Sequence, residues 1–450
     1  MTPTVRPLWQ RFLVFLVPLM ASNILQSLSG TINNIYVGQL IGVEALAAAS
    51  TFFPIVFFLM SFIIGLSSGS TVLIGQAWGA RNIDKVKQVA GTTLTVSMLA
   101  GVVVAVLGGL FTPQIMAVLG APPDIVEVAI GYGRIFLIGM PAFFLFLVVT
   151  SILRGVGDTI TPFVALTISI AVGLVTTPAL ILGWFGLPRI GVDAAAVASI
   201  AGFIAVLVFL FFYLRIRKHA LAPDRVLLSH LRINPQLLML ILKLGVPAGV
   251  QMVVSSVAAI VVVGLVNRFG SEATAAYGAV NQVLSYVQFP AMSIGIATSI
   301  FGAQAIGGGQ ASQLRAITRT GLMMNVIITG ALIVLAYLFS EHIVRLFLTE
   351  DRVVEMTQTL LHIVLWSVVL FGASVVLTGI MRASGTVLVP MLISLATILC
   401  VELPGAILFS QHFGLNGIWM GYALSFSTML LFQSGYYWFF WRKKKVVALV

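Results

Sequence analysis

Residues 89–111 read VAGTTLTVSMLAGVVVAVLGGLF, a run of 23 positions without a charged side chain. A helix rises about 1.5 Å per residue, so about 20 apolar residues cross the roughly 30 Å hydrocarbon core of a bilayer. Over the whole chain, 60% of the residues are apolar and 8% are charged. That composition leaves too little charge for the surface of a soluble protein of this size. The stretch therefore predicts a transmembrane helix in an integral membrane protein.

Apolar runs of similar length, bounded by charges or by Gly and Pro, recur along the chain. With residues 89–111, the predicted spans are 12–35, 51–75, 89–111, 128–151, 160–183, 194–214, 238–265, 277–303, 317–339, 354–380, 387–409 and 416–440. The first run follows Arg6 and Arg11, as in a signal peptide, but no small-x-small cleavage site follows it, so we interpret it as a retained span. The predicted fold is all-α, with twelve transmembrane helices.

The chain is strongly basic, with a net charge of +11. Alternate connections between the predicted spans hold 18 of the 24 basic residues: Arg6, Arg11, Arg81, Lys85, Lys87, Arg154, Arg215, Arg217, Lys218, Arg225, Arg232, Arg315, Arg319, Arg382, Arg442, Lys443, Lys444 and Lys445. Basic loops stay on the cytoplasmic side of a bacterial-type inner membrane, which predicts that both termini are cytoplasmic. The basic charge is therefore explained without a nucleic-acid partner. The single cysteine, Cys400, excludes a disulfide within the chain.

The second half of the chain repeats the first at a distance of about 228 residues. The matches include Pro18 with Pro247, Glu44 with Glu272, Gln76-Ala-Trp-Gly79 with Gln304-Ala-Ile-Gly307, and Arg154 with Arg382. Because six spans are an even number, both halves enter the membrane in the same direction. We predict two parallel six-helix repeats around a central cleft: an N-terminal lobe at 1–220, a cytoplasmic linker at 221–236 and a C-terminal lobe at 237–450.

Three motifs in the first half carry a family resemblance. They are residues 33–48, NNIYVGQLIGVEALAA, then Gly75-Gln76, and then Leu153-Arg154-Gly155-Val-Gly157-Asp158-Thr159 before Pro162, and the second half echoes them at 245–247, 272–276 and 381–382. In combination they resemble the multidrug and toxic compound extrusion (MATE) transporters. The resemblance implies two six-helix lobes around a cleft, alternating access, and export of organic, often cationic, compounds driven by inward flow of protons or sodium.

The sequence departs from the family where the coupling ion is usually bound. Asn33 stands at the position of the first-span carboxylate, and Gly173 and Thr177 replace the Asn and Asp that precede Pro178. Ser255 stands where some members carry an acid in the second lobe. The resemblance therefore supports the fold and the transport class better than the coupling mechanism.

Two titratable residues are candidates for ion coupling. Glu402 is the one acidic residue well inside a predicted span, and an ionised side chain at that depth costs at least about 2.5 kcal/mol. The alternative is a structural Glu402 that reaches a neighbouring hydroxyl or stays protonated. His362 is the one histidine within a span, with Trp366 a turn later, and the pair is interpreted either as a proton sensor and cation-stacking site or as packing residues.

Polar faces on several predicted spans are the candidates for a substrate cleft. Gln26 and Asn33 share one face of span one, Gln251 and Ser255 lie a turn apart on span seven, and Tyr277, Asn281 and Gln288 line span eight. In span two, Phe53 and Phe57 occupy the positions that match Asn281 and Ser285 of span eight, and Trp366 of span ten is a further candidate. Such polar residues also join helices within membranes, and Phe stripes also face lipid, so both interpretations stay open.

The leading hypothesis is a secondary active multidrug or organic-cation efflux antiporter, driven by a proton or sodium gradient, that binds a small, cationic, amphiphilic substrate and works as a monomer. No cofactor or metal site is predicted, and no nucleotide-binding loop, HExxH or GxSxG motif is present. One alternative is a flippase for a lipid-linked oligosaccharide, which would need basic residues in the cleft. Another is a membrane-embedded enzyme, which one Glu and one His support weakly.

Overall fold

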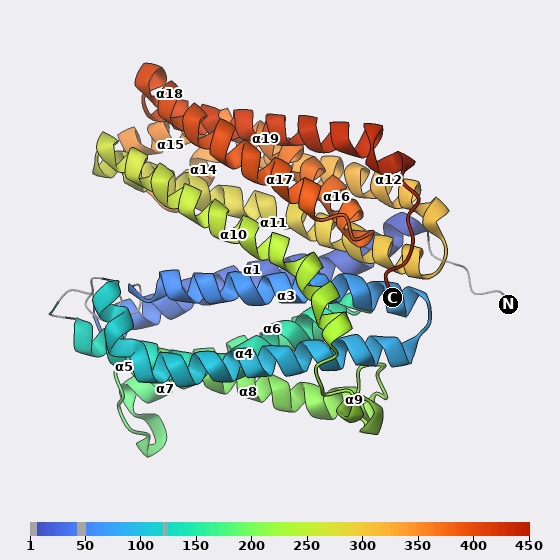
Figure 1. Cartoon of the computed structure of the whole chain (residues 1–450). Helices are drawn as coiled ribbons and strands as arrows, with labels where there is room; N and C mark the ends of the chain where they lie inside the picture. Colours follow the sequence, from blue (N-terminus) through green and yellow to red (C-terminus); the bar gives the residue numbers. More distant parts are fainter. Residues whose placement is uncertain (1–6, 43–50, 120–122, 124) are drawn as a thin grey trace. The chain divides into compact units, whose positions relative to one another are not determined.

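The computed structural model describes residues 7–42, 51–119, 123 and 125–450 (Figure 1). Within these ranges the chain is helical and contains no strand. Among the described residues, eleven helices are long and apolar enough to span a membrane, and α5 (Val126–Ile138) with α6 (Met140–Gly155), bent by 49°, makes a twelfth when the pair is taken as one span. The prediction of an all-α protein with twelve membrane spans is confirmed.

The chain folds into two compact units. Unit A is Ala21–Gly249, and unit B joins Val250–Val450 to the described residues up to Met20. Besides α5 and α6, unit A holds α3 (Phe53–Gly79), α4 (Ile83–Val118), α7 (Ile160–Leu182), the short η1 (Trp184–Gly186), α8 (Asp193–Ile216) and α9 (Arg225–Ser229). Two long helices, α1 (Leu8–Leu40) and α10 (Pro235–Val266), each contribute to both units.

Several spans of unit B are interrupted by a short turn of different pitch. Two spans contain a π-turn: η4 (Asn325–Thr329) lies between α12 (Leu314–Met324) and α13 (Gly330–Leu338), and η6 (Ile398–Glu402) lies between α17 (Leu388–Thr397) and α18 (Leu403–Phe413). A 3-10 turn, η5 (Leu365–Ser367), joins α15 (Asp351–Val364) to α16 (Val368–Ala383). The other elements are η2 (Asn267–Phe269), α11 (Ser271–Gly307), η3 (Ala311–Gln313), α14 (Ser340–Arg345), α19 (Leu415–Phe439) and η7 (Trp441–Lys443).

The two halves of the chain pair their helices in the same way. In the first half α6 packs on α3 and α4, and α7 packs on α8. In the second half α16 packs on α11 and α12, and α18 packs on α19. These are the pairs expected if one six-helix pattern occurs twice, with α3 matched to α11, α6 to α16 and α8 to α19. The helix order therefore agrees with the internal repeat.

The first part of α1 belongs to unit B, and the first part of α10 belongs to unit A. The limits of the units therefore differ from those of the lobes at 1–220 and 237–450. The lobes are defined by the repeat and stay a prediction. In unit A, Gly65 and Gly69 of α3 pack directly against Gly245 and Gly249 of α10. A Cβ on Gly245 would lie 2.3 Å from the carbonyl oxygen of Gly65. In unit B, the Phe12 ring of α1 lies 4.8 Å from the Phe301 ring of α11. Small residues and aromatic rings thus fix these helix segments.

The predicted linker is bound to unit A by polar contacts. Lys87 of α4 forms an ion pair with Asp224, whose other carboxylate oxygen accepts from the backbone N–H of Leu227 at 2.9 Å and so caps α9. Burial alone would raise the pKa of Asp224, but the hydrogen bonds from Lys87 and Leu227 outweigh it, and the pKa lies below its ordinary value. His230 Nε2 lies 3.0 Å from Asp84 Oδ1. The chain therefore stays on unit A until it enters α10.

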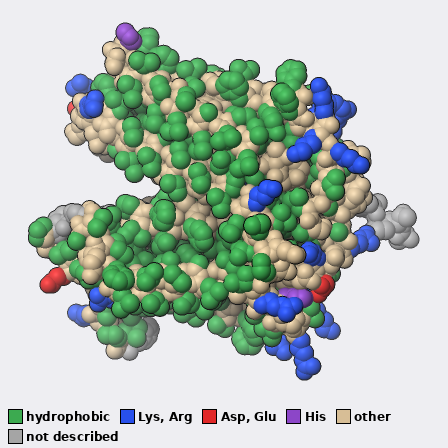
Figure 2. Space-filling view, in the orientation of Figure 1, with side chains coloured by type: hydrophobic (Ala, Val, Ile, Leu, Met, Phe, Trp, Pro, Cys, Tyr) green, Lys and Arg blue, Asp and Glu red, His purple; other side chains and the backbone are tan. Residues whose placement is uncertain are grey.

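The flanks of the helices are apolar and open. Leu110 of α4 and Leu431 of α19 expose 66% and 67% of their surface. Hydrophobic side chains cover the flank of each unit that is visible in Figure 2, and Lys and Arg gather mainly toward one end of its helices. Exposed apolar surface on this scale is expected where lipid, rather than water, surrounds the helices.

Candidate functional site

Glu402 ends the π-turn η6 in the middle of a span. Pro404, two residues later, has no N–H, so it removes the hydrogen bond that would reach back one turn along the helix. Single π-turns inside α-helices are rare and occur often at functional sites. Glu402 follows the first residue of α17 by 14 positions and precedes the last residue of α18 by 11. At about 1.5 Å per residue it lies roughly 15–20 Å from either end of the span.

The Glu402 side chain is buried, with 7% of its surface exposed. Ser425 of α19 donates a hydrogen bond to its Oε2 at 3.0 Å. Among the described residues, no Lys, Arg or His forms an ion pair with it. A buried carboxylate without a cationic partner is costly, so the neutral, protonated form is favoured at this depth. The hydroxyl of Ser425 is the kind of neighbour that a purely structural Glu402 was expected to have. The same geometry also suits a Glu402 that binds and releases a proton.

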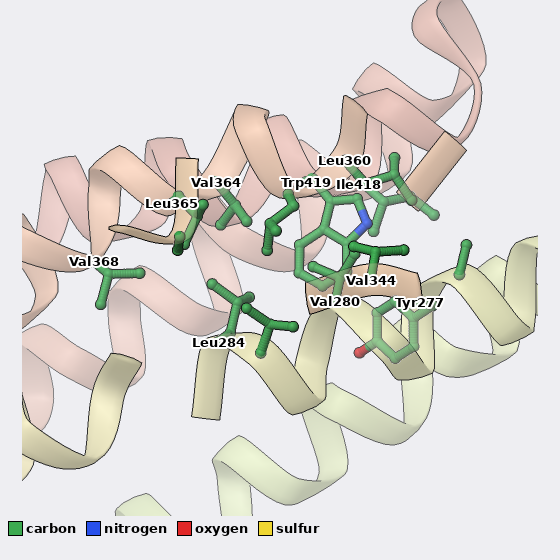
Figure 3. Packing of buried hydrophobic residues seen from close by; sticks show 14 of the residues in the cluster. Tyr277, Val280, Leu284, Val344, Leu360, Val364, Leu365, Val368, Ile418 and Trp419 are labelled. Carbon is green, nitrogen blue, oxygen red and sulfur yellow. The ribbon is translucent and has the colours of Figure 1, made fainter. Parts of the chain in front are cut away.

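Aromatic rings pack together inside unit B, and one of them, Tyr422, lies near Glu402. Figure 3 shows Trp419 of α19 and Tyr277 of α11 within the buried hydrophobic cluster of this unit. The Trp419 ring lies 5.2 Å from the Tyr277 ring and 5.2 Å from the Tyr422 ring. The two tyrosine hydroxyl oxygens are 3.4 Å apart, and Tyr422 is close enough to Glu402 to interact with it electrostatically. Two polar oxygens are therefore held together in an apolar surrounding.

His362 belongs to a different part of unit B. Its Nε2 lies 3.2 Å from Ser340 Oγ, and its ring lies 5.0 Å from that of Tyr337. The Tyr337 hydroxyl donates to the carbonyl oxygen of His362 at 2.8 Å. These partners come from α13 and α14, whereas the hydrogen-bond partner of Glu402 comes from α19. Trp366, half exposed, is separated from His362 by the start of η5. The coupling role of His362 stays a prediction.

The predicted cleft residues are divided between the two units. In unit A, Gln26 is exposed, Asn33 is half-buried and Phe57 is 39% exposed, while the side chain of Phe53 lies outside the described set. In unit B, Ser255 is exposed and Tyr277 is buried in the core, and three further candidates are half-buried: Gln251, Asn281 and Gln288. That these residues line one cleft stays a prediction.

Sequence reasoning missed the partners of Glu402 on the last span. Trp419, Tyr422 and Phe426 follow one another at spacings of three and four, and Ser425 lies beside them. This spacing places them on one face of α19. The signal is present in the sequence, but nothing in it shows that this face meets the face of span eleven that carries Glu402. Among the described residues, no group of three His, Cys, Asp or Glu side chains is placed to hold a metal ion.

The repeated six-helix pattern defines a multi-pass membrane protein built from an internal repeat, as many transporter folds are. The MatE family model matches residues 18–179 and again residues 247–408. The chain belongs to this family, the MATE transporters, and the resemblance found from its motifs is confirmed. The two matches are also two copies of one pattern, in agreement with the internal repeat.

Known proteins resemble the chain over nearly its full length. The probable multidrug resistance protein YoeA of Bacillus subtilis is 46% identical over 444 residues, which cover 98% of this chain and 96% of that protein. The probable multidrug resistance protein NorM of Thermotoga maritima is 25% identical, over 96% of this chain and 93% of its own. A mutant of the Vibrio cholerae MATE transporter VcmN superposes with a TM-score of 0.87 at 20% identity, over 97% and 98% of the two chains, and shares the fold.

Proposed function

We propose that this protein is a secondary active exporter of small, organic, cationic and amphiphilic compounds, and that proton exchange at Glu402 drives it by alternating access. The observation that carries the proposal is a buried carboxyl at mid-span whose hydrogen-bond donor is the Ser425 hydroxyl. A carboxyl in that setting gains and loses a proton according to the side of the membrane that it meets. It would act without a cofactor, in a single chain.

Protons suit Glu402 better than sodium as the coupling ion. A hard cation requires several oxygen ligands arranged around it. In contrast, a proton needs one carboxyl oxygen, and the Ser425 hydroxyl can donate to the other oxygen at the same time. Glu402 has one direct hydrogen-bond partner among the described residues. Proton coupling is therefore the simpler interpretation of this site.

The substrate class rests on the relatives and on the predicted cleft residues. YoeA and NorM carry the words multidrug resistance in their names. Aromatic faces attract organic cations, and amides such as those of Gln26, Asn33 and Gln288 hydrogen-bond polar groups. A site that combines the two accepts amphiphilic molecules of varied shape.

Inside-out vesicles distinguish the two driving ions. With the interior made acidic and sodium equal on both sides, a fluorescent organic cation is expected to accumulate, because protons leaving the vesicle drive the cation inward. Under a sodium gradient at equal pH, uptake of the cation is expected to equal the uptake by vesicles that lack the protein. Accumulation driven by sodium alone would reject proton coupling. The proposed exporter would be rejected if none of a panel of organic cations accumulated under either gradient.

The proposed orientation places both termini and the linker in the cytoplasm. A cysteine introduced in the linker by Arg225→Cys, with Cys400→Ser removing the exposed native thiol, is expected to resist a membrane-impermeant maleimide in intact cells and to react in inside-out vesicles. Leu346→Cys, at a connection that is 81% exposed, serves as the matched external position and is expected to react in intact cells. Labelling of position 225 from outside would overturn this orientation.

A further inference from the structure

Three pairs of polar side chains in unit B, called the row below, follow one another along the helices from Glu402 toward one end of the unit. The row begins with the hydrogen bond from Ser425 to Glu402, 3.0 Å long. It continues to the hydroxyl pair of Tyr422 and Tyr277, 3.4 Å apart. It ends where the Thr274 hydroxyl donates to Asn267 Oδ1 at 2.9 Å, in the turn between α10 and α11. Tyr277 belongs to the buried hydrophobic cluster of this unit, and Tyr422 packs against that cluster.

Along both α19 and α11, successive members of the row lie nearer the same end of the unit. On α19, Ser425 lies ten positions after the first residue and Tyr422 lies seven after it. On α11, Tyr277 lies six positions after the first residue and Thr274 lies three after it. Each step of about three residues is one helical turn, so successive members share a helix face. The proposed orientation makes this end the external one.

The tyrosine pair is fixed in place by its neighbours. The Trp419 ring packs against both tyrosine rings, and the centroid of the Tyr422 ring lies 6.4 Å from that of the Phe426 ring. Tyr277 exposes 7% of its surface. A hydroxyl in such a core would be costly unless it had a partner, and the structure provides each of the two with the other. Trp419 is thus a positioning residue for the pair.

We propose that Tyr422 and Tyr277 conduct protons between Glu402 and the Asn267–Thr274 end of unit B. The proposal rests on the proposed function, because it presupposes that Glu402 exchanges a proton. In each transfer a tyrosine hydroxyl oxygen accepts an incoming proton and forms a new O–H bond with it. Its original O–H bond breaks, and the released proton passes to the next acceptor, so both tyrosines end neutral. The last proton forms an O–H bond on the carboxylate of Glu402. The steps where side chains do not bond directly would require a bridging water.

The proposed proton route stays within one unit. The row lies within one unit, and none of its links uses a residue of unit A. Coupling then follows from the protonation state of Glu402.

The test compares single Tyr→Phe variants in proteoliposomes. Tyr422→Phe and Tyr277→Phe each remove one oxygen and keep the ring, and each is expected to slow export driven by a pH gradient about tenfold or more. Substrate binding at equilibrium without a gradient is expected to stay unchanged in Tyr422→Phe, which alters no predicted cleft residue. Slow proton transfer also predicts a larger solvent isotope effect in D2O than for the parent protein. Tyr286→Phe, on the same helix α11 and with its ring against Phe289, is the matched control and is expected to export at the parent rate.

The outcomes separate the relay from the proposed function. If both Phe variants export at the parent rate while Glu402→Gln is inactive, the relay is rejected and Glu402 remains the coupling group. If Glu402→Gln also exports normally, the relay and the coupling role of Glu402 are both rejected, while the proposed export itself stands. If a Phe variant lowers thermal stability or substrate binding as much as it lowers export, the tyrosine pair is structural and the relay is rejected. Slow export with intact binding and a raised isotope effect supports it.

Discussion

Replacing Glu402 by glutamine is expected to reduce gradient-driven export to the level of protein-free vesicles. Glutamine keeps the size of the side chain and can still accept the hydrogen bond from Ser425, so the fold and membrane insertion are expected to survive. What it loses is the ability to bind and release a proton. Since the family's usual acidic positions are occupied by Asn33, Thr177 and Ser255, no carboxyl at those positions replaces it.

Transport by purified protein in proteoliposomes, with an imposed pH gradient, measures this effect. Glu355→Gln makes the same chemical change at an exposed position of α15 and is expected to leave export unchanged. His362→Gln is expected to shift the pH dependence and to lower the rate less than Glu402→Gln does. A Glu402→Gln protein that exports at the normal rate would establish the structural interpretation of this residue, in which the hydroxyl of Ser425 serves only to satisfy a buried carboxyl.

Gly245→Ala is expected to destabilise unit A strongly. The added Cβ would lie 2.3 Å from the carbonyl oxygen and 2.8 Å from the carbonyl carbon of Gly65, and both are backbone atoms that no side-chain rotation can move. Overpacking of this kind costs about 1–3 kcal/mol or more, against a gain of about 1 kcal/mol for removing a helical glycine. The helices α3 and α10 must therefore move apart, and we expect the melting temperature to fall by roughly 5 °C.

Thermal unfolding in detergent, followed by tryptophan fluorescence, measures the change. Gly264→Ala lies on the same helix, where an added Cβ has no neighbour within 4 Å, and it is expected to be neutral or slightly stabilising. The pair of variants isolates the contact with α3 from the general effect of alanine in a helix. Equal melting temperatures for the two would show that the close approach of Gly65 and Gly245 does not hold these helices together.

The sequence predicted the helices well because lipid imposes a strict rule. A span must satisfy its backbone hydrogen bonds internally and present about 20 apolar residues, so each span is visible in the linear order. The bent span of α5 and α6 was still found as one run at 128–151, because its apolar composition continues through the bend. The packing partners of α1 and α10 could not be predicted, since their contacts depend on glycines and rings distant in sequence.

Glu402 was selected from sequence because a lone acid inside an apolar run is conspicuous, and its cost follows from depth alone. Its surroundings were not predictable. The rotation of one helix against another decides each of these contacts. Ser425 hydrogen-bonds the carboxyl of Glu402, the hydroxyl of Tyr277 lies beside that of Tyr422, and His362 lies within hydrogen-bond distance of Ser340. The sequence by itself determined the membrane spans, the repeat and the rare titratable group, because these follow from local composition. Only the tertiary structure decided which side chains meet, because the rotation and crossing of packed helices are fixed by many small contacts at once.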